Sequence, residues 1–148
     1  MSAPLYIASD HAGFALKTFL INHVNYEWED LGTHSEERVD YPDYADLVAQ
    51  KVSKAPETTK GVLICGSGQG MAIRANRWPF VRAALCYNEE VAKLARAHNN
   101  ANILCLGGRL LKPEEAVNIL DTFLQTPFEG GRHQRRVEKL SAPINSKE

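Results

Sequence analysis

The feature that most constrains this fold is an apolar run that ends directly in a glycine-rich loop. Gly61–Cys65 reads GVLIC, and a continuously apolar strand is typical of a sheet that helices cover on both faces. Gly66–Gly70 follows at once, and a short helix is predicted from about Met71. The pattern therefore predicts a βα unit in the middle of a mainly parallel sheet.

The rest of the chain repeats this unit. Short apolar runs alternate with stretches in which apolar residues recur every three or four positions, which predicts an α/β fold with five strands. Leu47 is assigned to the buried stripe of the second long helix. The predicted strands are 5–9, 26–31, 61–65, 81–86 and 103–106. The predicted helices are 14–24, a helix starting near 40–42, a short one from about 71, one opened by Asn88, 113–126, and about 131–140, before a polar tail at 141–148.

Composition narrows the class of protein. The chain has 148 residues, enough for one domain (1–148), and its apolar fraction of 44% is that of ordinary globular proteins. A net charge of −1 lacks the basic excess expected of a nucleic-acid binder. No apolar run reaches the ~20 residues of a membrane helix, so we expect a cytoplasmic protein without a membrane partner. The three cysteines form no C-x-x-C pair, which predicts reduced thiols and no metal site.

Polar residues follow three of the predicted strands. They are Ser9-Asp10-His11, Cys65 with its glycine loop, and Gly107-Gly108-Arg109. Ligands bind at the carboxyl ends of parallel strands, near a topological switch point, so we expect these groups to surround a site.

The glycine loop has a functional and a structural interpretation. Its closely spaced backbone N–H groups could stabilise an anion or a developing oxyanion, or the loop could simply be a tight turn. Nucleotide binding is disfavoured, because the third glycine of the dinucleotide fingerprint falls on Met71 and no Gly-Lys-Ser/Thr follows. Cys65 is a candidate base or nucleophile, or else a small core residue, as we take Cys86 and Cys105 to be. A C-x5-R phosphatase loop is absent, since Met71 again occupies the required position.

Three further candidates are ambiguous when each is taken alone. Arg132 and Arg136 lie one helical turn apart and could bind one phosphate, or they could belong to a solvated basic face. His98 could be a catalytic group or a C-terminal helix cap. Asp10 could bind substrate or only cap the first helix.

Taken together, the motifs resemble the ribose-5-phosphate isomerase B family. The resemblance runs from about residue 5 to 140 and implies a Rossmann-like three-layer αβα sandwich with a five-stranded sheet. It also implies a homodimer or dimer of dimers with shared active sites, and interconversion of ribose 5-phosphate and ribulose 5-phosphate without a cofactor or metal. The motifs are Ser9–Gly13, Asp40–Ala45, Cys65–Gly70, Arg96–Asn99 and Glu129–Arg136.

The resemblance also assigns roles. Cys65 is the base that moves a proton between C1 and C2, and His98 opens the furanose ring. Ser67 and the loop amides stabilise the enediolate. Asp10 holds sugar oxygens. The remaining substrate-binding positions are His11, Gly66, Gly68, Gln69, Gly70, Asn99, Arg109, Arg132 and Arg136.

One branch of the family uses a glutamate as the base, just after the glycine loop. Met71 stands there in this chain, so the thiol branch fits better. Two alternatives remain: an isomerase of allose 6-phosphate or galactose 6-phosphate, and a flavin- or nucleotide-binding module. The sequence leaves open the preferred sugar, whether the assembly is a dimer or a tetramer, and which subunit supplies each phosphate-binding residue.

Overall fold

A computed structural model describes residues 4–144 and contains a five-stranded sheet in which every pair of neighbours is parallel. The strand order is β2-β1-β3-β5-β4, so the predicted α/β class is confirmed. The strands are β1 (Leu5–Ser9), β2 (Trp28–Asp30), β3 (Lys60–Cys65), β4 (Ala83–Leu85) and β5 (Ile103–Gly107).

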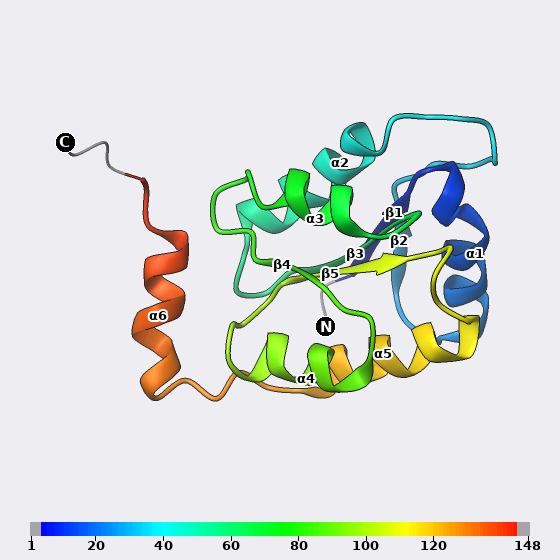
Figure 1. Cartoon of the computed structure of the whole chain (residues 1–148). Coiled ribbons are helices and arrows are strands. Elements are labelled where there is room, and N and C mark those ends of the chain that lie inside the picture. Colours follow the sequence, from blue (N-terminus) through cyan, green and yellow to red (C-terminus); the bar gives the residue numbers. More distant parts are fainter. Residues whose placement is uncertain (1–3, 145–148) are drawn as a thin grey trace.

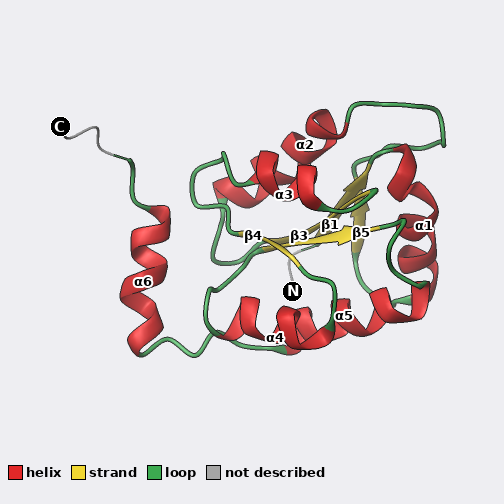
Figure 2. Ribbon diagram, viewed as in Figure 1, coloured by secondary structure: helices red, strands yellow, loops and turns green. Residues whose placement is uncertain are grey.

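Helices cover both faces of the sheet, which gives the predicted three layers (Figures 1 and 2). Helices α1, α4 and α5 pack on one face, and α2 and α3 pack on the other. Helix α6 stands outside the layers, at the side of the molecule where β4 begins (Figure 1). The helices are η1 (His11–Gly13), α1 (Phe14–His23), α2 (Tyr41–Lys54), α3 (Gln69–Ala75), α4 (Glu89–Ala97), α5 (Pro113–Gln125) and α6 (Arg132–Ser141).

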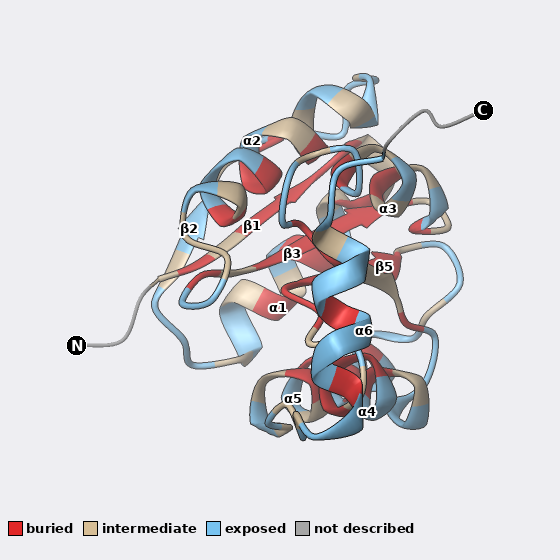
Figure 3. Ribbon diagram, turned by 90° about the vertical axis from the view of Figure 1, so that its left-hand side faces the viewer, coloured by how far each residue is buried: buried red, intermediate tan, exposed pale blue. Residues whose placement is uncertain are grey.

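The central strand β3 is buried as its sequence predicts. Val62 and Ile64 face the α1/α4/α5 layer, whereas Leu63 and Cys65 face α2 and α3. Burying an aliphatic side chain of this size contributes roughly 1.5–3 kcal/mol, so this two-sided core holds the end of β3 in place. Figure 3 shows the burial concentrated in the strands and the helix faces turned toward them, whereas α6 is mostly exposed.

Local signals in the sequence placed most helix ends correctly. The Asn88 side chain caps α4 by accepting a hydrogen bond from the Val91 N–H at 2.8 Å. Pro113 begins α5, and α6 ends one residue beyond its predicted end. The last four residues of the predicted polar tail lie outside the described residues.

Some details differ from the prediction. Strands β2 and β4 are shorter than expected, because each is an edge strand that pairs with a single neighbour. The assignment of Leu47 to a buried stripe is wrong, since its side chain is 43% exposed. The buried positions of α2 are Ala45, Val48, Ala49 and Val52. Within the described residues, no helix combines the length and apolar character needed to cross a membrane.

The strand order places a topological switch point between β1 and β3. From β1 the chain moves outward to β2, and then returns to form β3 on the other side of β1. Asp10 follows β1 and Cys65 is the last residue of β3, so both lie at the position where parallel α/β sheets bind ligands.

Candidate active site

A cavity of about 410 Å³ lies at this switch point. Four segments that are distant in the sequence contribute to it: the end of β1, the start of α2, the glycine loop and the turn after β5. Each of the three predicted strand ends contributes a polar residue to its lining: Asp10, Cys65 and Arg109. Its lining residues are Asp10, Tyr41, Cys65, Gly66, Ser67, Gly70, Arg109 and Leu110.

Cys65 is fixed at the base of the glycine loop. Its Sγ accepts a hydrogen bond from the Gly68 N–H at 3.2 Å, and its carbonyl accepts one from the Gly108 N–H at 2.8 Å. This contact holds the sulfur beside the N–H groups of the glycine loop. Cys65 also lines the cavity, which is the position that a base needs.

The other two cysteines have a different environment. Burial raises the pKa of the Cys86 thiol to about 12, and it raises the pKa of Cys105 well above its ordinary value. Both side chains pack in the core as free thiols. Their interpretation as small core residues is confirmed; Cys65 packs in the same core cluster as Cys105 but also lines the pocket.

The glycine loop needs its glycines for steric reasons. Gly68 has φ +82°, and a Cβ there would lie 2.6 Å from Leu85 Cδ1 and 3.0 Å from the Leu106 carbonyl carbon. Ser67 Oγ accepts a weak hydrogen bond from the Gln69 N–H at 3.4 Å, while the Gln69 side chain is exposed. Helix α3 begins at Gln69, two residues earlier than predicted, so Gln69 and Gly70 belong to its first turn and Gly66–Gly68 precede it.

Asp10 and His11 both have structural partners. Asp10 Oδ1 accepts a hydrogen bond from the Gly13 N–H at 3.0 Å, so the capping interpretation is correct, yet the residue also lines the pocket. His11 Nδ1 accepts a hydrogen bond from the Val39 N–H at 3.2 Å. This bond fastens the loop before α2 to the turn after β1, and it leaves Nε2 as the ring atom available to a ligand.

Arg109 and Tyr41 lie against opposite ends of the glycine loop. The Arg109 N–H donates to the Gly66 carbonyl at 3.0 Å, and a Cβ on Gly66 would lie 3.2 Å from Arg109 Nη1. The Tyr41 ring packs directly against Gly70. The sequence analysis assigned Tyr41 no role, because only the fold brings the start of α2 beside α3.

A second polar cluster lies at the end of α4 and the start of α6. The rings of His98 and His133 stack with centroids 4.2 Å apart and planes 13° apart. Glu129 Oε1 lies 3.9 Å from His98 Nε2 and 3.6 Å from His133 Nε2. Burial lowers the pKa of His133, and the neighbouring His98 and Arg132 lower it further. The candidate ligand atoms of His98, Glu129 and His133 lie within 4.8 Å of one another. One metal ion could bind all three only if the two imidazole rings left their parallel stack.

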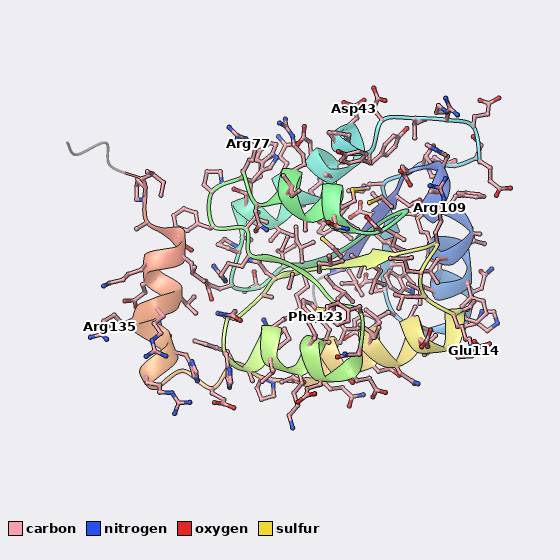
Figure 4. The ribbon with its side chains drawn as sticks, viewed as in Figure 1. Asp43, Arg77, Arg109, Glu114, Phe123 and Arg135 are labelled. Atoms are coloured by element: carbon pink, nitrogen blue, oxygen red, sulfur yellow. The ribbon has the colours of Figure 1, made fainter. Side chains whose placement is uncertain are left out.

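The structure does not bring this cluster to the pocket. Figure 4 shows Arg109 on the side where the strands end and Arg135 of α6 on the opposite side. Arg132 and Arg136 are exposed on α6, and Asn99 lines a separate cavity beside Arg82 and Leu140. The residues assigned from the sequence thus fall into two groups within one chain. The group remote from the pocket is His98, Asn99, Arg132 and Arg136.

Comparisons with known proteins agree with both the fold and the motifs. Residues 5–140 match the family model described as Ribose/Galactose Isomerase. The chain is 44% identical over 136 residues to ribose-5-phosphate isomerase B of Escherichia coli, covering 90% of this chain and 91% of that protein. The crystal structure of a ribose 5-phosphate isomerase from Thermotoga maritima has a TM-score of 0.90 and 53% identity, covering 95% of this chain and 99% of that one. The Mycoplasma genitalium enzyme, solved with bound ribulose-5-phosphate, has a TM-score of 0.91 and 46% identity, covering 95% of each chain.

Proposed function

The chain belongs to the ribose/galactose isomerase family and is an isomerase; from this premise we propose that it interconverts D-ribose 5-phosphate and D-ribulose 5-phosphate. Relatives of this name match nearly the whole chain, and one of them was solved with ribulose-5-phosphate bound. Action in the pentose phosphate pathway and a cytoplasmic location are parts of the same proposal. Flavin or nucleotide binding loses its support, because the matched family is described as sugar isomerases.

The pocket at the switch point performs the proton transfer. The Cys65 thiolate takes the proton from C2 of the open-chain aldose, and the C1 carbonyl oxygen becomes an enediolate oxygen. The C2 hydroxyl proton then passes to O1, and the same carbon-bound proton or a solvent proton returns to C1 as C2 becomes the carbonyl. A C–H beside a carbonyl is a weak acid, so the base acts only if the enediolate is stabilised at the same moment. The Gly68 N–H to Sγ contact of 3.2 Å supports the placement of the thiolate.

The glycine loop is the natural partner of this base. Gly66, Ser67 and Gly70 of this loop line the same cavity as Cys65. One well-placed donor to a developing oxyanion contributes about 3 kcal/mol to transition-state stabilisation. Asp10 and Arg109 line the remaining wall and would bind the sugar hydroxyls.

Ring opening and phosphate binding fall to the second cluster. We assign ring opening to His98, and phosphate binding to Arg132 and Arg136 together with His11. Because His98 and α6 do not reach the pocket of their own chain, a second copy of the chain must supply them. The separation of the two groups is the observation on which this shared-site proposal rests. A two-fold dimer places each remote cluster at the partner's pocket, giving two equivalent sites.

Mixing two inactive variants tests the shared site. Cys65→Ala removes the base, and His98→Asn removes the ring-opening group. If the two groups come from different chains, each mixed dimer retains one intact site. Random exchange of subunits should then restore about a quarter of wild-type ribose-5-phosphate turnover. Turnover that stays at the level of the separate variants, although mass spectrometry shows mixed dimers, would contradict a shared site. Allose 6-phosphate and galactose 6-phosphate, assayed beside ribose 5-phosphate, identify the preferred sugar.

A further inference from the structure

Glu129 is the acidic residue of the remote cluster that faces both histidines, and no role has been assigned to it so far. Its Oε1 lies 3.9 Å from Nε2 of His98 and 3.6 Å from Nε2 of His133. It precedes α6, separated from it by Gly130 and Gly131, whose positive φ angles form the turn. Its backbone N–H donates to the Ala97 carbonyl at 3.0 Å, which fixes Glu129 beside the end of α4.

The buried His133 ring is the surface on which His98 stacks. The His133 side chain is about nine-tenths buried, and its backbone N–H donates to the Gly130 carbonyl at 3.0 Å. Among residues 4–144 its Nε2 has no hydrogen-bond partner, and it lies 3.6 Å from Glu129 Oε1. The His98 ring stacks on this ring, and its Nε2 lies 3.9 Å from Glu129 Oε1, which is within ion-pair distance but longer than a hydrogen bond. The His98 side chain is 35% exposed, which leaves it accessible to a ligand.

We propose that Glu129 is the positioning residue of His98, holding its imidazole in the orientation needed for ring opening and stabilising the imidazolium formed during that step. The proposal rests on the assignment of ring opening to His98. A carboxylate beside a catalytic imidazole acts by fixing the ring and compensating its transient positive charge, without itself taking the proton.

The chemistry shows what Glu129 would stabilise. Ring opening breaks the C1–O4 bond, forms the C1 carbonyl, removes a proton from the anomeric hydroxyl and delivers one to O4. His98 takes the first proton and returns it to O4, so protons balance and no co-reactant is required. The imidazolium exists only between these two transfers, so a carboxylate within about 4 Å of it lowers the barrier to ring opening. Proton transfer by Cys65 does not pass through this state.

Two assays on the full-length protein separate the steps. Conversion of ribose 5-phosphate requires ring opening, because this aldose exists mainly as a furanose. Ribulose 5-phosphate cannot form that ring, so exchange of its C1 hydrogen with D₂O, followed by proton NMR, requires substrate binding and proton transfer by Cys65 but no ring opening. Glu129→Gln keeps the shape of the side chain and removes its charge. We expect the turnover of ribose 5-phosphate to fall about ten-fold or more, while the exchange rate stays within about two-fold of wild type.

The controls distinguish positioning from a loss of structure. Glu138→Gln removes the same charge from α6, where the carboxylate contacts Gln134 and no histidine, and should change neither rate. Glu129→Asp should recover part of the lost turnover. Equal loss of both rates in Glu129→Gln, or no loss in either, would overturn the role of Glu129. Wild-type protein that neither converts ribose 5-phosphate nor exchanges the C1 hydrogen would instead overturn the proposed function.

Discussion

The switch-point pocket and the α4/α6 cluster are built in opposite ways. The pocket is made of strand ends and a glycine loop that the core holds in place, and Cys65 is only 5% exposed. The cluster combines one buried histidine with exposed residues on a helix outside the three layers. Cys65, to which we assign the transfer of a carbon-bound proton, therefore lies in the protein interior. The residues to which we assign ring opening and phosphate binding lie instead on a surface that a second copy can approach.

The largest effect on activity should come from a substitution in the switch-point pocket. We expect Cys65→Ala to reduce ribose-5-phosphate turnover about 10³-fold or more, because no other thiol lines the pocket to act as the base. The C1 hydrogen exchange of ribulose 5-phosphate should be lost equally, measured by proton NMR. Alanine fits the end of β3, so the free energy of unfolding should change by about 1 kcal/mol or less. A variant with normal turnover would refute the assignment of the base.

A smaller effect on activity should come from a substitution on the exposed face of α6. Arg136→Ala should raise KM for ribose 5-phosphate about 10-fold to 100-fold and leave kcat within a few-fold, because phosphate is bound equally in the ground and transition states. Arg135→Ala is the matched control, since it removes the same charge about 100° further around α6. If initial-rate kinetics gave Arg136→Ala an unchanged KM, the phosphate site would have to lie elsewhere.

The smallest effect, on stability rather than activity, should come from hydrogen bonds outside both sites. The Asp46 carboxylate on α2 accepts hydrogen bonds from Arg74 Nε at 2.8 Å and Nη2 at 2.9 Å, and from the Trp78 indole at 2.9 Å. These bonds tie α2, which begins with Tyr41, to α3, which follows the glycine loop. Asp46→Asn should lower the free energy of unfolding by about 1 kcal/mol in urea titrations, a modest figure because Arg74 is 43% exposed.

The stability that these Asp46 hydrogen bonds contribute depends on pH in a defined way. The hydrogen bond from Arg74 holds the pKa of Asp46 below its ordinary value. A lowered folded-state pKa contributes stability that is complete above about pH 4 and is lost as the pH falls through that lowered value. The difference in stability between wild type and Asp46→Asn should therefore shrink in acid. A difference that stayed constant down to about pH 2 would show that Asp46 acts by packing alone.

The sequence predicted the switch-point pocket better than the α4/α6 cluster. The apolar run into Gly66–Gly70 and the polar residues after β1 and β5 located the pocket, because parallel strands all end at the same edge. Tyr41 was missed, since the contact of its ring with Gly70 depends on how two helices pack. The sequence linked Arg132 and Arg136 to a phosphate but could not show their separation from Cys65, because the direction of α6 follows from tertiary structure.

The position of α6 beyond the three layers also bears on substrate length. When the thiol and the paired guanidinium groups come from different copies, the gap between them is set by how the copies seat against each other. One extra carbon in the sugar lengthens the required gap by about 1.5 Å at most, a change within reach of a small adjustment in that seating. In such an arrangement, selectivity between pentose and hexose phosphates can drift through substitutions at the contact surface while the glycine loop stays unaltered.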